Sequence, residues 1–342
     1  MNVLFVVNTE FHLFVSLYLY YNNYINNNVK FIVIKSKFRF QDSYQFNKLN
    51  VEFIDNTDFN NLKKYNKNII SQINNISTNS YDKVYVFQDA DFINNLLIST
   101  LKSKKSKLEI TLVQDGLVAY VSDYDKVKTL KKRIKLNLLK YFYGYKKLNT
   151  TLFWGSNYLI DNYLVSSPEH TIIKTNKKIE KLEFNATSLF SNQLIFDFFK
   201  FDSSKYSLSS EKRYVFFISQ GYISEKSRKI EIKILNLLIE KCNLHNYELI
   251  VKLHPSESIE TFSQFTLSNN TTIISEKFPA EFIMINIKNS IIMSGYSSSL
   301  LINIQTNKFF WIYPMIYDIN FNFKLDHIKV LNTINDLNTI FE

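Results

Sequence analysis

Short apolar runs that end close to a glycine are the feature of this sequence that most constrains its fold. The chain has only five glycines in 342 residues, so each position is informative. The runs 108–113, 151–154, 214–218 and 291–293 precede Gly116, Gly155, Gly221 and Gly295. Stretches with helical periodicity come after them. An apolar strand that ends in a turn and leads into a helix is typical of the βα unit of a buried parallel sheet.

Further apolar runs alternate with helical stretches along the whole chain. We expect more strands at 3–7, 30–34, 83–87, 248–252, 272–274 and 308–312. We expect helices at 11–24, 60–76, 92–102, 225–242, 280–287 and 298–305. This alternation predicts α/β layers with sites at the C-terminal ends of the strands.

A polar, serine-rich stretch at 203–213 indicates a linker between two domains. We therefore expect two Rossmann-like halves with a cleft between them. The N-terminal domain would cover residues 1–205, and the C-terminal domain would cover residues 206–342.

Composition narrows the function classes. Lys and Arg total 41 against 31 acidic residues, a formal charge of +10, but few of the 41 are arginine. A specific DNA reader usually places arginine forks on guanine, so we expect no nucleic-acid partner. The single cysteine, Cys242, excludes an internal disulfide framework. The first residues lack a basic signal-peptide region, and the apolar run 13–21 is too short to span a bilayer, so we expect a cytoplasmic protein.

The segment 113–116 places a carboxylate at a strand end. Asp115 follows the apolar run, and Gly116 permits a sharp turn that leaves the carboxylate facing the expected cleft. A general base needs this placement, because it must reach an incoming hydroxyl and have its pKa tuned by partial burial. The alternative is an Asp-Gly turn in which Asp115 binds backbone donors. Both interpretations stay open on this motif alone.

His254 also lies just past an apolar run, with Pro255 preventing continuation of the strand. Lys252 is two residues earlier, so in an extended segment it points the same way as His254. Two groups that can carry positive charge at one strand end suit a phosphate-bearing ligand. A polar histidine in a loop is the alternative.

Other strand ends of the second half carry further polar groups. Ser297-Ser298-Ser299 follows a glycine turn, where hydroxyls and N–H groups form either an anion site or a plain N-cap. Ser219-Gln220-Gly221 ends another strand and offers backbone donors. Glu281 lies in the first turn of an expected helix, where it binds a ligand or merely favours the helix dipole.

The first half offers candidates for the acceptor side. Thr9 and His12 follow the first strand and, with Gly116, could line the cleft. We expect acceptor choice to lie around 9–12, Gln88-Asp89 and Gly155-Ser156-Asn157. The other histidines, His170, His245 and His327, have loop-like neighbours and are expected to be solvated.

Metal and phosphate-loop motifs are missing from the sequence. There is no glycine-rich phosphate loop and no H-E-x-x-H motif. Asp123-Tyr124-Asp125 has the spacing of a D-x-D sugar-nucleotide metal motif, but it lies at a helix entry, which favours a capping role. We therefore expect no metal cofactor.

Taken together, these segments resemble the bacterial sialyltransferases of GT-B architecture, which include lipooligosaccharide sialyltransferases, polysialyltransferases and multifunctional sialyltransferases. The family has an acid-acid-Gly motif, then Lys-x-His-Pro, a Glu one βα unit on and a Ser-Ser pair in the next. The corresponding positions are Gln114-Asp115-Gly116, Lys252-Leu253-His254-Pro255, Glu281 and Ser298-Ser299. The match is close over 252–299 and depends on one tripeptide in the first half, where Gln114 replaces the first acid.

The resemblance implies inverting transfer of sialic acid, or a related nonulosonic acid, from a CMP-activated donor to a glycan hydroxyl of a capsule or lipooligosaccharide. Asp115 would take the acceptor proton, and His254 would stabilise the departing phosphate. Lys252 and Glu281 would hold cytosine and ribose, and the Ser298-Ser299 pair would bind phosphate oxygens. The N-terminal domain would then bind the acceptor, and the C-terminal domain would bind CMP. A leaving group with one phosphate fits a site without metal.

The segment 126–147, from Lys126 to Lys147, holds nine Lys or Arg residues interleaved with apolar ones. This spacing predicts a basic amphipathic helix. It is either a core-packed helix with a solvated lysine face or a contact to the anionic inner membrane, where lipid-linked glycan acceptors are found.

Two other functions remain alternatives. Capsule Kdo transferases and teichoic-acid (CDP-glycerol) glycerophosphotransferases of the same fold also use His-Pro and Ser-rich segments with CMP- or CDP-linked donors. A basic protein that binds membrane or nucleic acid without catalysis is the alternative from another class. The sequence indicates neither the acceptor, nor the linkage, nor the oligomeric state.

Overall fold

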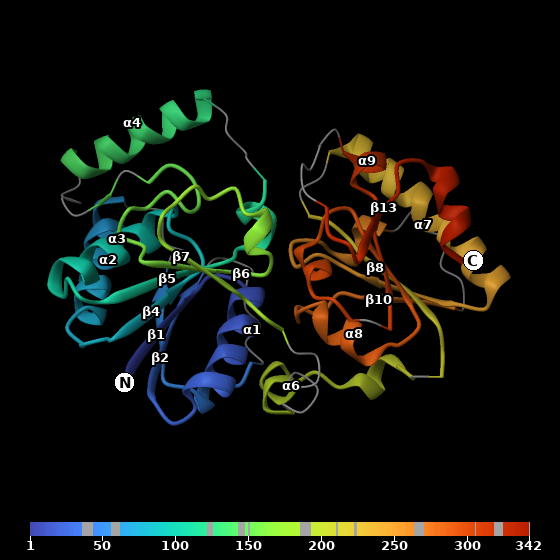
Figure 1. Cartoon of the computed structure of the whole chain (residues 1–342), viewed down its shortest axis with the longest axis horizontal. Helices are drawn as coiled ribbons and strands as arrows, with labels where there is room; N and C mark the ends of the chain where they lie inside the picture. The colour runs from blue at the N-terminus through green and yellow to red at the C-terminus, as the bar shows by residue number, and fades with distance from the viewer. Residues whose placement is uncertain are drawn as a thin grey trace. The chain divides into compact units, whose positions relative to one another are not determined.

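A computed structural model of the chain describes residues 1–35, 44–55, 62–121, 126–142, 148–149, 151–184, 193–209, 211–221, 224–262, 270–304, 306–317 and 324–341. It divides into two compact units, Met1–Glu183 and Phe184–Glu342 (Figure 1). We had expected the division at 205. The serine-rich stretch folds with the second unit, because the Tyr214 hydroxyl donates to the Ser207 carbonyl at 3.2 Å. The roles expected for the two halves stay predictions.

The first unit is built on a parallel sheet with the order β3-β2-β1-β4-β5-β6-β7. The described strands are β1 (Asn2–Val7), β2 (Asn28–Lys35), β3 (Val51–Asp55), β4 (Lys83–Val86), β5 (Glu109–Val113), β6 (Asn162–Val165) and β7 (Lys178–Lys181). The first strand, β1, lies inside the sheet, and the order of the strands reverses between β1 and β4. Ligands of open α/β sheets bind outside the carboxyl ends of strands at such a switch point.

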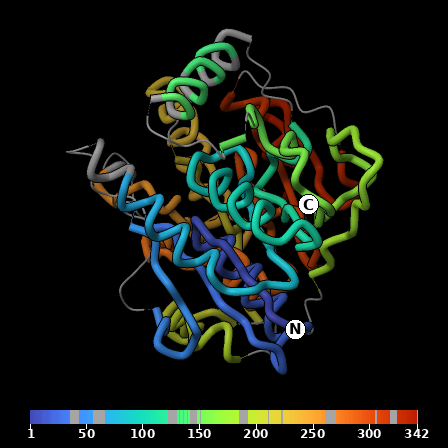
Figure 2. Tube along the Cα trace, turned by 90° about the vertical axis from the view of Figure 1, so that its left-hand side faces the viewer, coloured from blue at the N-terminus to red at the C-terminus, as the bar shows by residue number. Residues whose placement is uncertain are grey.

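Helices cover both faces of this sheet. They are α1 (Glu10–Leu19), which continues as a π-helical turn (Tyr20–Tyr24), α2 (Leu62–Ile76) and α3 (Phe92–Lys104). A further helix, α4 (Lys126–Phe142), follows β5 in the chain. The β1–β2 and β4–β5 crossovers lead away from the switch point in opposite directions. Right-handed connections therefore place α1 and α3 on opposite faces. The helices α2 and α3 lie side by side (Figures 1 and 2).

The second unit repeats this plan, with the parallel order β10-β9-β8-β11-β12-β13. Its strands are β8 (Tyr214–Ile218), β9 (Glu248–Lys252), β10 (Thr271–Ile274), β11 (Ile291–Ser294), β12 (Lys308–Trp311) and β13 (Ile328–Val330). Its helices are α6 (Gln193–Phe199), α7 (Glu225–His245), α8 (Glu281–Asn286) and α9 (Tyr313–Ile316). The switch point lies between β8 and β11.

Each sheet buries continuous apolar strands, as expected for parallel sheets covered by helices. In the second unit, Ile234, Leu235 and Leu238 of α7 are completely buried in one cluster with Val215 and Phe217 of β8. The helical period of α7 thus matches the apolar face of β8 and fixes the helix above the switch point.

The expected fold class, layered α/β with two Rossmann-like units, is confirmed. Two local expectations are wrong. Residues 151–154 form no strand; they belong to a loop in which Gly155 has a φ of 79°. The expected helix at 298–305 is a short 3-10 turn, Ser298–Leu301, because Ser297 caps it through its hydroxyl and the chain leaves it extended at Ile302.

Candidate active site

The first candidate residue, Asp115, lies directly after β5, one strand from the switch point of the first unit. Its Oδ1 is 2.8 Å from Nε2 of His12, and its Oδ2 accepts a hydrogen bond from Nε2 of Gln88 at 2.7 Å. Gly116 has a φ of 60°, the left-handed region in which glycine is favoured, so the chain turns sharply there. The Asp115 side chain makes no cap bond to the 3-10 turn that follows. The Asp115 carboxylate thus contacts two side chains from other segments, His12 of α1 and Gln88 after β4.

The imidazole of His12, in the first turn of α1, is fixed by the backbone that precedes the helix. Its Nδ1 accepts a hydrogen bond from the Asn8 N–H at 3.2 Å, so in the neutral ring Nε2 carries the proton and donates to Asp115. The ring is completely buried and stacks on Phe87 at 4.4 Å. Thr9 caps α1 by accepting a bond from the His12 N–H at 3.2 Å. His12 is therefore a donor with one defined orientation.

Gln88 and Asp89, which follow β4, have different roles. Gln88 faces Asp115, as described above. Asp89 is completely buried, and its two carboxylate oxygens accept the N–H groups of Gly155 and Asn157, each at 3.0 Å. Asp89 thus organises the loop around Gly155 at the same edge of the sheet, while Gln88 holds the candidate base.

Gln114 stands where the sialyltransferase pattern has its first acid, and its side chain points away from Asp115. Its Oε1 accepts from the Tyr120 hydroxyl at 2.5 Å and from the Ser166 N–H at 2.8 Å, and the residue is buried. Burial raises the pKa of the Tyr120 hydroxyl to about 12, so it stays a donor. Gln114 therefore connects β5 to the end of β6 and takes no part in the contacts of Asp115.

This first cluster presents a partly exposed carboxylate in a fixed orientation. The Asp115 side chain is 23% exposed, whereas that of His12 is 0% exposed. His12 and Gln88 hold Asp115 in one orientation, and the partial exposure of the carboxylate leaves it within reach of an incoming group. Chemically, the cluster can accept a proton from a bound hydroxyl.

In the second unit, Gln220 crosses the switch point. Its Nε2 donates to the Ser294 hydroxyl at 2.9 Å, and that hydroxyl donates to the Ile218 carbonyl at 2.9 Å. Ser294 also accepts the Ser297 N–H at 3.2 Å. The ends of β8 and β11 are thus joined into one rigid edge.

The three serines after β11 form a capped turn. The Ser297 hydroxyl accepts the Ser299 N–H at 3.2 Å, and both Ser297 and Ser298 are half-buried. His327, which was expected to be solvated, is half-buried, and its Nε2 lies 2.9 Å from the Leu300 carbonyl at the end of the same turn. That expectation was wrong, because the turn supplies the ring with a backbone acceptor.

His254 lies in the turn that follows β9, together with Pro255. Its Nδ1 accepts the Ser256 N–H at 3.2 Å and lies 2.7 Å from the Ser256 hydroxyl oxygen, so in the neutral ring that hydroxyl also donates to Nδ1 and Nε2 carries the proton. The imidazole packs against Gly221, where an added Cβ would be 2.4 Å from Nδ1 of His254. A glycine is needed there because any side chain would displace the ring.

Lys252 and Glu281 are both buried nearby. The Lys252 ammonium donates to the carbonyls of Leu253 at 3.2 Å and Glu276 at 2.6 Å. Burial raises the pKa of the Glu281 carboxyl, while the Ser299 hydroxyl and Lys252 oppose this change. Within the described part of the chain, Oε1 of Glu281 has no hydrogen-bond partner. A buried polar atom without a partner is rare and fits a ligand hydroxyl or amine.

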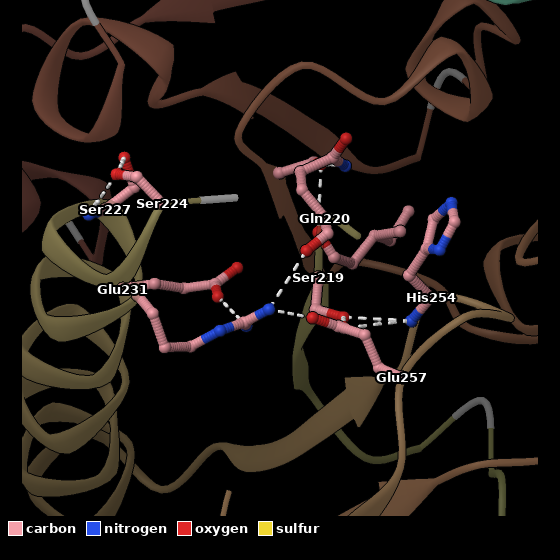
Figure 3. A network of polar contacts seen from close by, with 10 residues as sticks. Ser219, Gln220, Ser224, Ser227, Glu231, His254 and Glu257 are labelled. Atoms are coloured by element: carbon pink, nitrogen blue, oxygen red, sulfur yellow. Dashed lines mark hydrogen bonds and ion pairs between the residues drawn. The ribbon is translucent and has the colours of Figure 1, made fainter. Parts of the chain in front are cut away.

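A charged network missed by the sequence analysis lies beneath His254 (Figure 3). Arg228 of α7 forms ion pairs with Glu231 and Glu257, and it donates to the Gln220 carbonyl at 3.2 Å. Glu257 accepts the Ser219 hydroxyl at 2.5 Å. Arg228 and Glu231 are three residues apart in α7, whereas Glu257 is 29 residues from Arg228 and 38 from Ser219. No local pattern therefore indicated the bonds of Glu257, although it follows His254 closely.

The structure therefore brings the expected residues together in two clusters, one in each unit. Thr9, His12, Asp115 and Gly116 meet at the ends of β1 and β5. Ser219-Gln220-Gly221, Lys252, His254-Pro255, Glu281 and Ser297-Ser298-Ser299 meet at the ends of β8, β9 and β11 and the start of α8. Asp123-Tyr124-Asp125 lies outside the described residues. Among those that are described, no group of three or more His, Cys, Asp or Glu side chains is placed to hold a metal ion.

A comparison with protein families finds one that spans most of the chain. The family model described as alpha-2,8-polysialyltransferase (POLYST) matches residues 3–310. This range includes every residue of both clusters. No curated protein matches the chain by sequence.

Solved structures show the same GT-B fold at low sequence identity. A 2,6-sialyltransferase from a Photobacterium species, in complex with the donor product CMP and the acceptor lactose, has a TM-score of 0.57 at 16% identity, covering 91% of this chain and 71% of that one. The UDP-GlcNAc 2-epimerase of Methanocaldococcus jannaschii has a TM-score of 0.55 at 12% identity, with 98% and 90% covered. The wall teichoic acid polymerase TagF has a TM-score of 0.52 at 11% identity, with 98% and 77% covered.

Proposed function

Because the chain belongs to the alpha-2,8-polysialyltransferase family, we propose that this sialyltransferase moves sialic acid, or a related nonulosonic acid, from a CMP-activated donor to a glycan hydroxyl with inversion. The glycan would be part of a surface polysaccharide or a lipooligosaccharide. The proposal needs both units, with the acceptor on the first and the donor on the second. Cytidine monophosphate and lactose bound to the Photobacterium enzyme support this choice of ligands.

Asp115 is the proposed general base. The acceptor hydroxyl attacks the anomeric carbon as its proton passes to the Asp115 carboxylate, and the bond from that carbon to the phosphate oxygen breaks. His12 and Gln88 hold the carboxylate at 2.8 Å and 2.7 Å, so it needs little reorganisation during the reaction. This arrangement of Asp115 is the single observation that carries the mechanism.

The second cluster would stabilise the departing CMP. The electron pair of the broken bond goes to the phosphate oxygen, and Nε2–H of His254 donates a hydrogen bond to it. Ser298 and Ser299 would bind the other phosphate oxygens. Glu281, beside Lys252, would take ribose or cytosine donors with its unpartnered Oε1. One phosphate carries little charge, so imidazole, hydroxyls and N–H groups suffice without a metal ion.

The test measures CMP release from CMP-sialic acid in the presence of a galactoside. We expect Asp115→Asn and His254→Ala each to lower kcat by about 100-fold or more, because general acid–base catalysis contributes on that order. Gln114→Glu is the matched control: it changes the residue next to the base, whose side chain faces away from Asp115. Full activity in both Asp115→Asn and His254→Ala would rule out the mechanism.

We also propose that α4 places the enzyme on an anionic inner-membrane surface. The apolar residues Leu130, Ile134, Leu138 and Tyr141 are all exposed and recur at helical spacing along one stripe. Lys131 and Arg133 are exposed beside them, and Leu136 is buried. The expected alternative, a core-packed apolar face, does not hold for this stripe. No described helix is long and apolar enough to cross a bilayer. Residues 143–147 of the basic segment lie outside the described residues.

A further inference from the structure

Glu257 is the junction of three segments at one end of the second sheet. Its Oε2 accepts the Ser219 hydroxyl at 2.5 Å and lies 3.3 Å from the His254 N–H. Its Oε1 forms an ion pair with Arg228 of α7. The carboxylate therefore connects the end of β8, the turn after β9 and the first turns of α7.

Each proton of this junction can be assigned. The His254 N–H donates to the Ser219 oxygen at 2.9 Å, and the Ser219 hydroxyl proton is then directed to Glu257. The Glu257 N–H donates to the His254 carbonyl at 2.8 Å and closes the turn. Arg228 also donates to the Gln220 carbonyl at 3.2 Å. The ion pair between Arg228 and Glu257 thus holds the backbone of Gln220 through Arg228 and the backbone of His254 through Glu257.

One side of the imidazole packs closely against Gly221, so a shift of this backbone displaces the ring. An added Cβ at Gly221 would be 2.4 Å from both Nδ1 of His254 and Oγ of Ser256. The Ser256 N–H, inside the same turn, sets which ring nitrogen carries the proton. A shift of the turn would therefore change both the position of the ring and its tautomer. Figure 3 shows the ring turned away from Glu257, so Glu257 does not contact it directly.

Burying these charges costs free energy, so fold stability alone does not account for them. The side chains of Arg228 and Glu257 are 15% and 5% exposed, and that of Glu231 is 0% exposed. A buried ion pair often stabilises a fold no better than apolar residues of the same size. Here the pair lies at the end of β8, where Arg228 also donates to the Gln220 carbonyl, and beneath the turn that holds the candidate catalytic imidazole.

We propose that Arg228 and Glu257 are positioning residues, which act through Ser219 and the backbone to hold His254 with its Nε2–H directed at the departing phosphate. This inference extends the proposed function and relies on it for the role of His254. Neither residue touches the reacting atoms.

The test compares Glu257→Gln, Arg228→Gln and Arg228→Lys. We expect the first two to lower kcat for CMP release by about 10- to 100-fold, since small misplacements of a catalytic group cost this much. The KM for the donor should change much less. Arg228→Lys keeps the charge and should recover part of the lost kcat. In the neutral ring, nitrogen-15 spectra of His254, assigned with His254→Asn, should show one protonated nitrogen in the wild type and mixed tautomers in both Gln variants.

The matched control is Lys229→Gln, the adjacent position of α7. Lys229 forms an exposed ion pair with Glu225 at 2.8 Å, so its removal also deletes one charge pair from this helix. We expect wild-type kcat and ring signals for it. Thermal unfolding identifies any variant that fails to fold; if Arg228→Gln does, Glu257→Gln and Arg228→Lys decide the test.

Different results would overturn the proposed sialyl transfer and the positioning role of Arg228 and Glu257. Absence of CMP release from the wild type would overturn the proposed function, while the ring signals would still report on positioning. Unchanged ring signals in folded Glu257→Gln, with a kcat equal to that of Lys229→Gln, would overturn the role of the ion pair.

Discussion

Two imidazoles in this chain are oriented by backbone N–H groups. Nδ1 of His12 accepts from Asn8, and Nδ1 of His254 accepts from Ser256. Each neutral ring therefore presents Nε2–H, which in His12 faces Asp115. A fixed tautomer removes one conformational choice before a ligand binds, which is the kind of preorganisation that catalysis uses.

Substitution of Gly221 should separate activity from stability. In Gly221→Ala, the new Cβ would be 2.4 Å from Nδ1 of His254, so the imidazole must move. We expect kcat for CMP release to fall by about 10- to 100-fold, with a small change in the midpoint of thermal unfolding. Lys226→Ala, at an exposed position of α7, is the control. Wild-type turnover in Gly221→Ala would mean that the ring position is not important.

The buried carboxyl of Glu231 should make stability depend on pH. Burial raises its pKa from 4.5 to about 7, against the opposing effect of Arg228. The folded state therefore binds this proton more tightly than the unfolded state. The resulting stabilisation is full below about pH 4.5 and is lost as the pH rises through about 7.

Glu231→Gln tests this linkage because the amide does not ionise. We expect the free energy of unfolding of the variant, relative to that of the wild type, to rise between pH 5 and pH 8, by at most ~3 kcal/mol. Chemical denaturation at both pH values measures it. Parallel pH profiles for the two proteins would contradict the assignment. Arg228 and Tyr317 are the ionisable neighbours that act on this carboxyl or respond to it.

Sequence patterns identified the residues at strand ends but not those that support them. Asp115 and His254 follow apolar runs, so their position was predictable. Arg228 and Glu257 were not, and Gln88 was expected on the acceptor side but not as the partner of Asp115, because only the folded sheet brings these partners close. Gln220 was assigned as a backbone donor, whereas its side chain forms the bond across the switch point.

At the level of elements, strands made of continuous apolar residues were predictable, and polar or very short ones were not. The strands β8 and β9 have the expected bounds, because continuous apolar residues fill them. The strand β7, with the sequence KIEK, lies at a sheet edge and has no buried residue, so its composition gave no signal. The strands β3, β6 and β13 were missed as well; they are short or only partly apolar.

The exposed stripe of α4 predicts a membrane contact that can be measured. We expect the protein to sediment with vesicles of anionic phospholipid and to be released by salt, since screening weakens the lysine contribution. Replacement of Leu130, Ile134 and Leu138 by Gln should lower the affinity by about 10-fold or more, because each loses buried apolar area.

Leu244→Gln is the control for this experiment. Leu244 is 75% exposed at the end of α7, so the substitution removes a comparable apolar side chain from a different helix. It should leave vesicle binding unchanged. Equal loss of vesicle binding in the control and in the α4 variant, or no binding by the wild type, would contradict a membrane contact through α4.

At the scale of the whole molecule, the proposed division of labour predicts where ligands protect the backbone. CMP should slow amide hydrogen exchange at 219–221 and 297–300 of the second unit, and it should leave 8–12 of the first unit unchanged. UDP and CDP-glycerol at the same concentration are the comparison. Stronger protection by either would favour a different donor, and protection of 8–12 by CMP alone would contradict the assigned roles.

Both sheets contain only parallel pairs among their described strands, and each is assembled from one uninterrupted length of chain. Parallel pairing joins residues that are distant in sequence, so neither sheet can form from a local hairpin. β1 is central and gains its second neighbour, β4, only when residues 83–86 have been made. During synthesis, however, everything needed for the first sheet precedes residue 184. The first unit can therefore finish folding outside the ribosome while the second unit is still being translated.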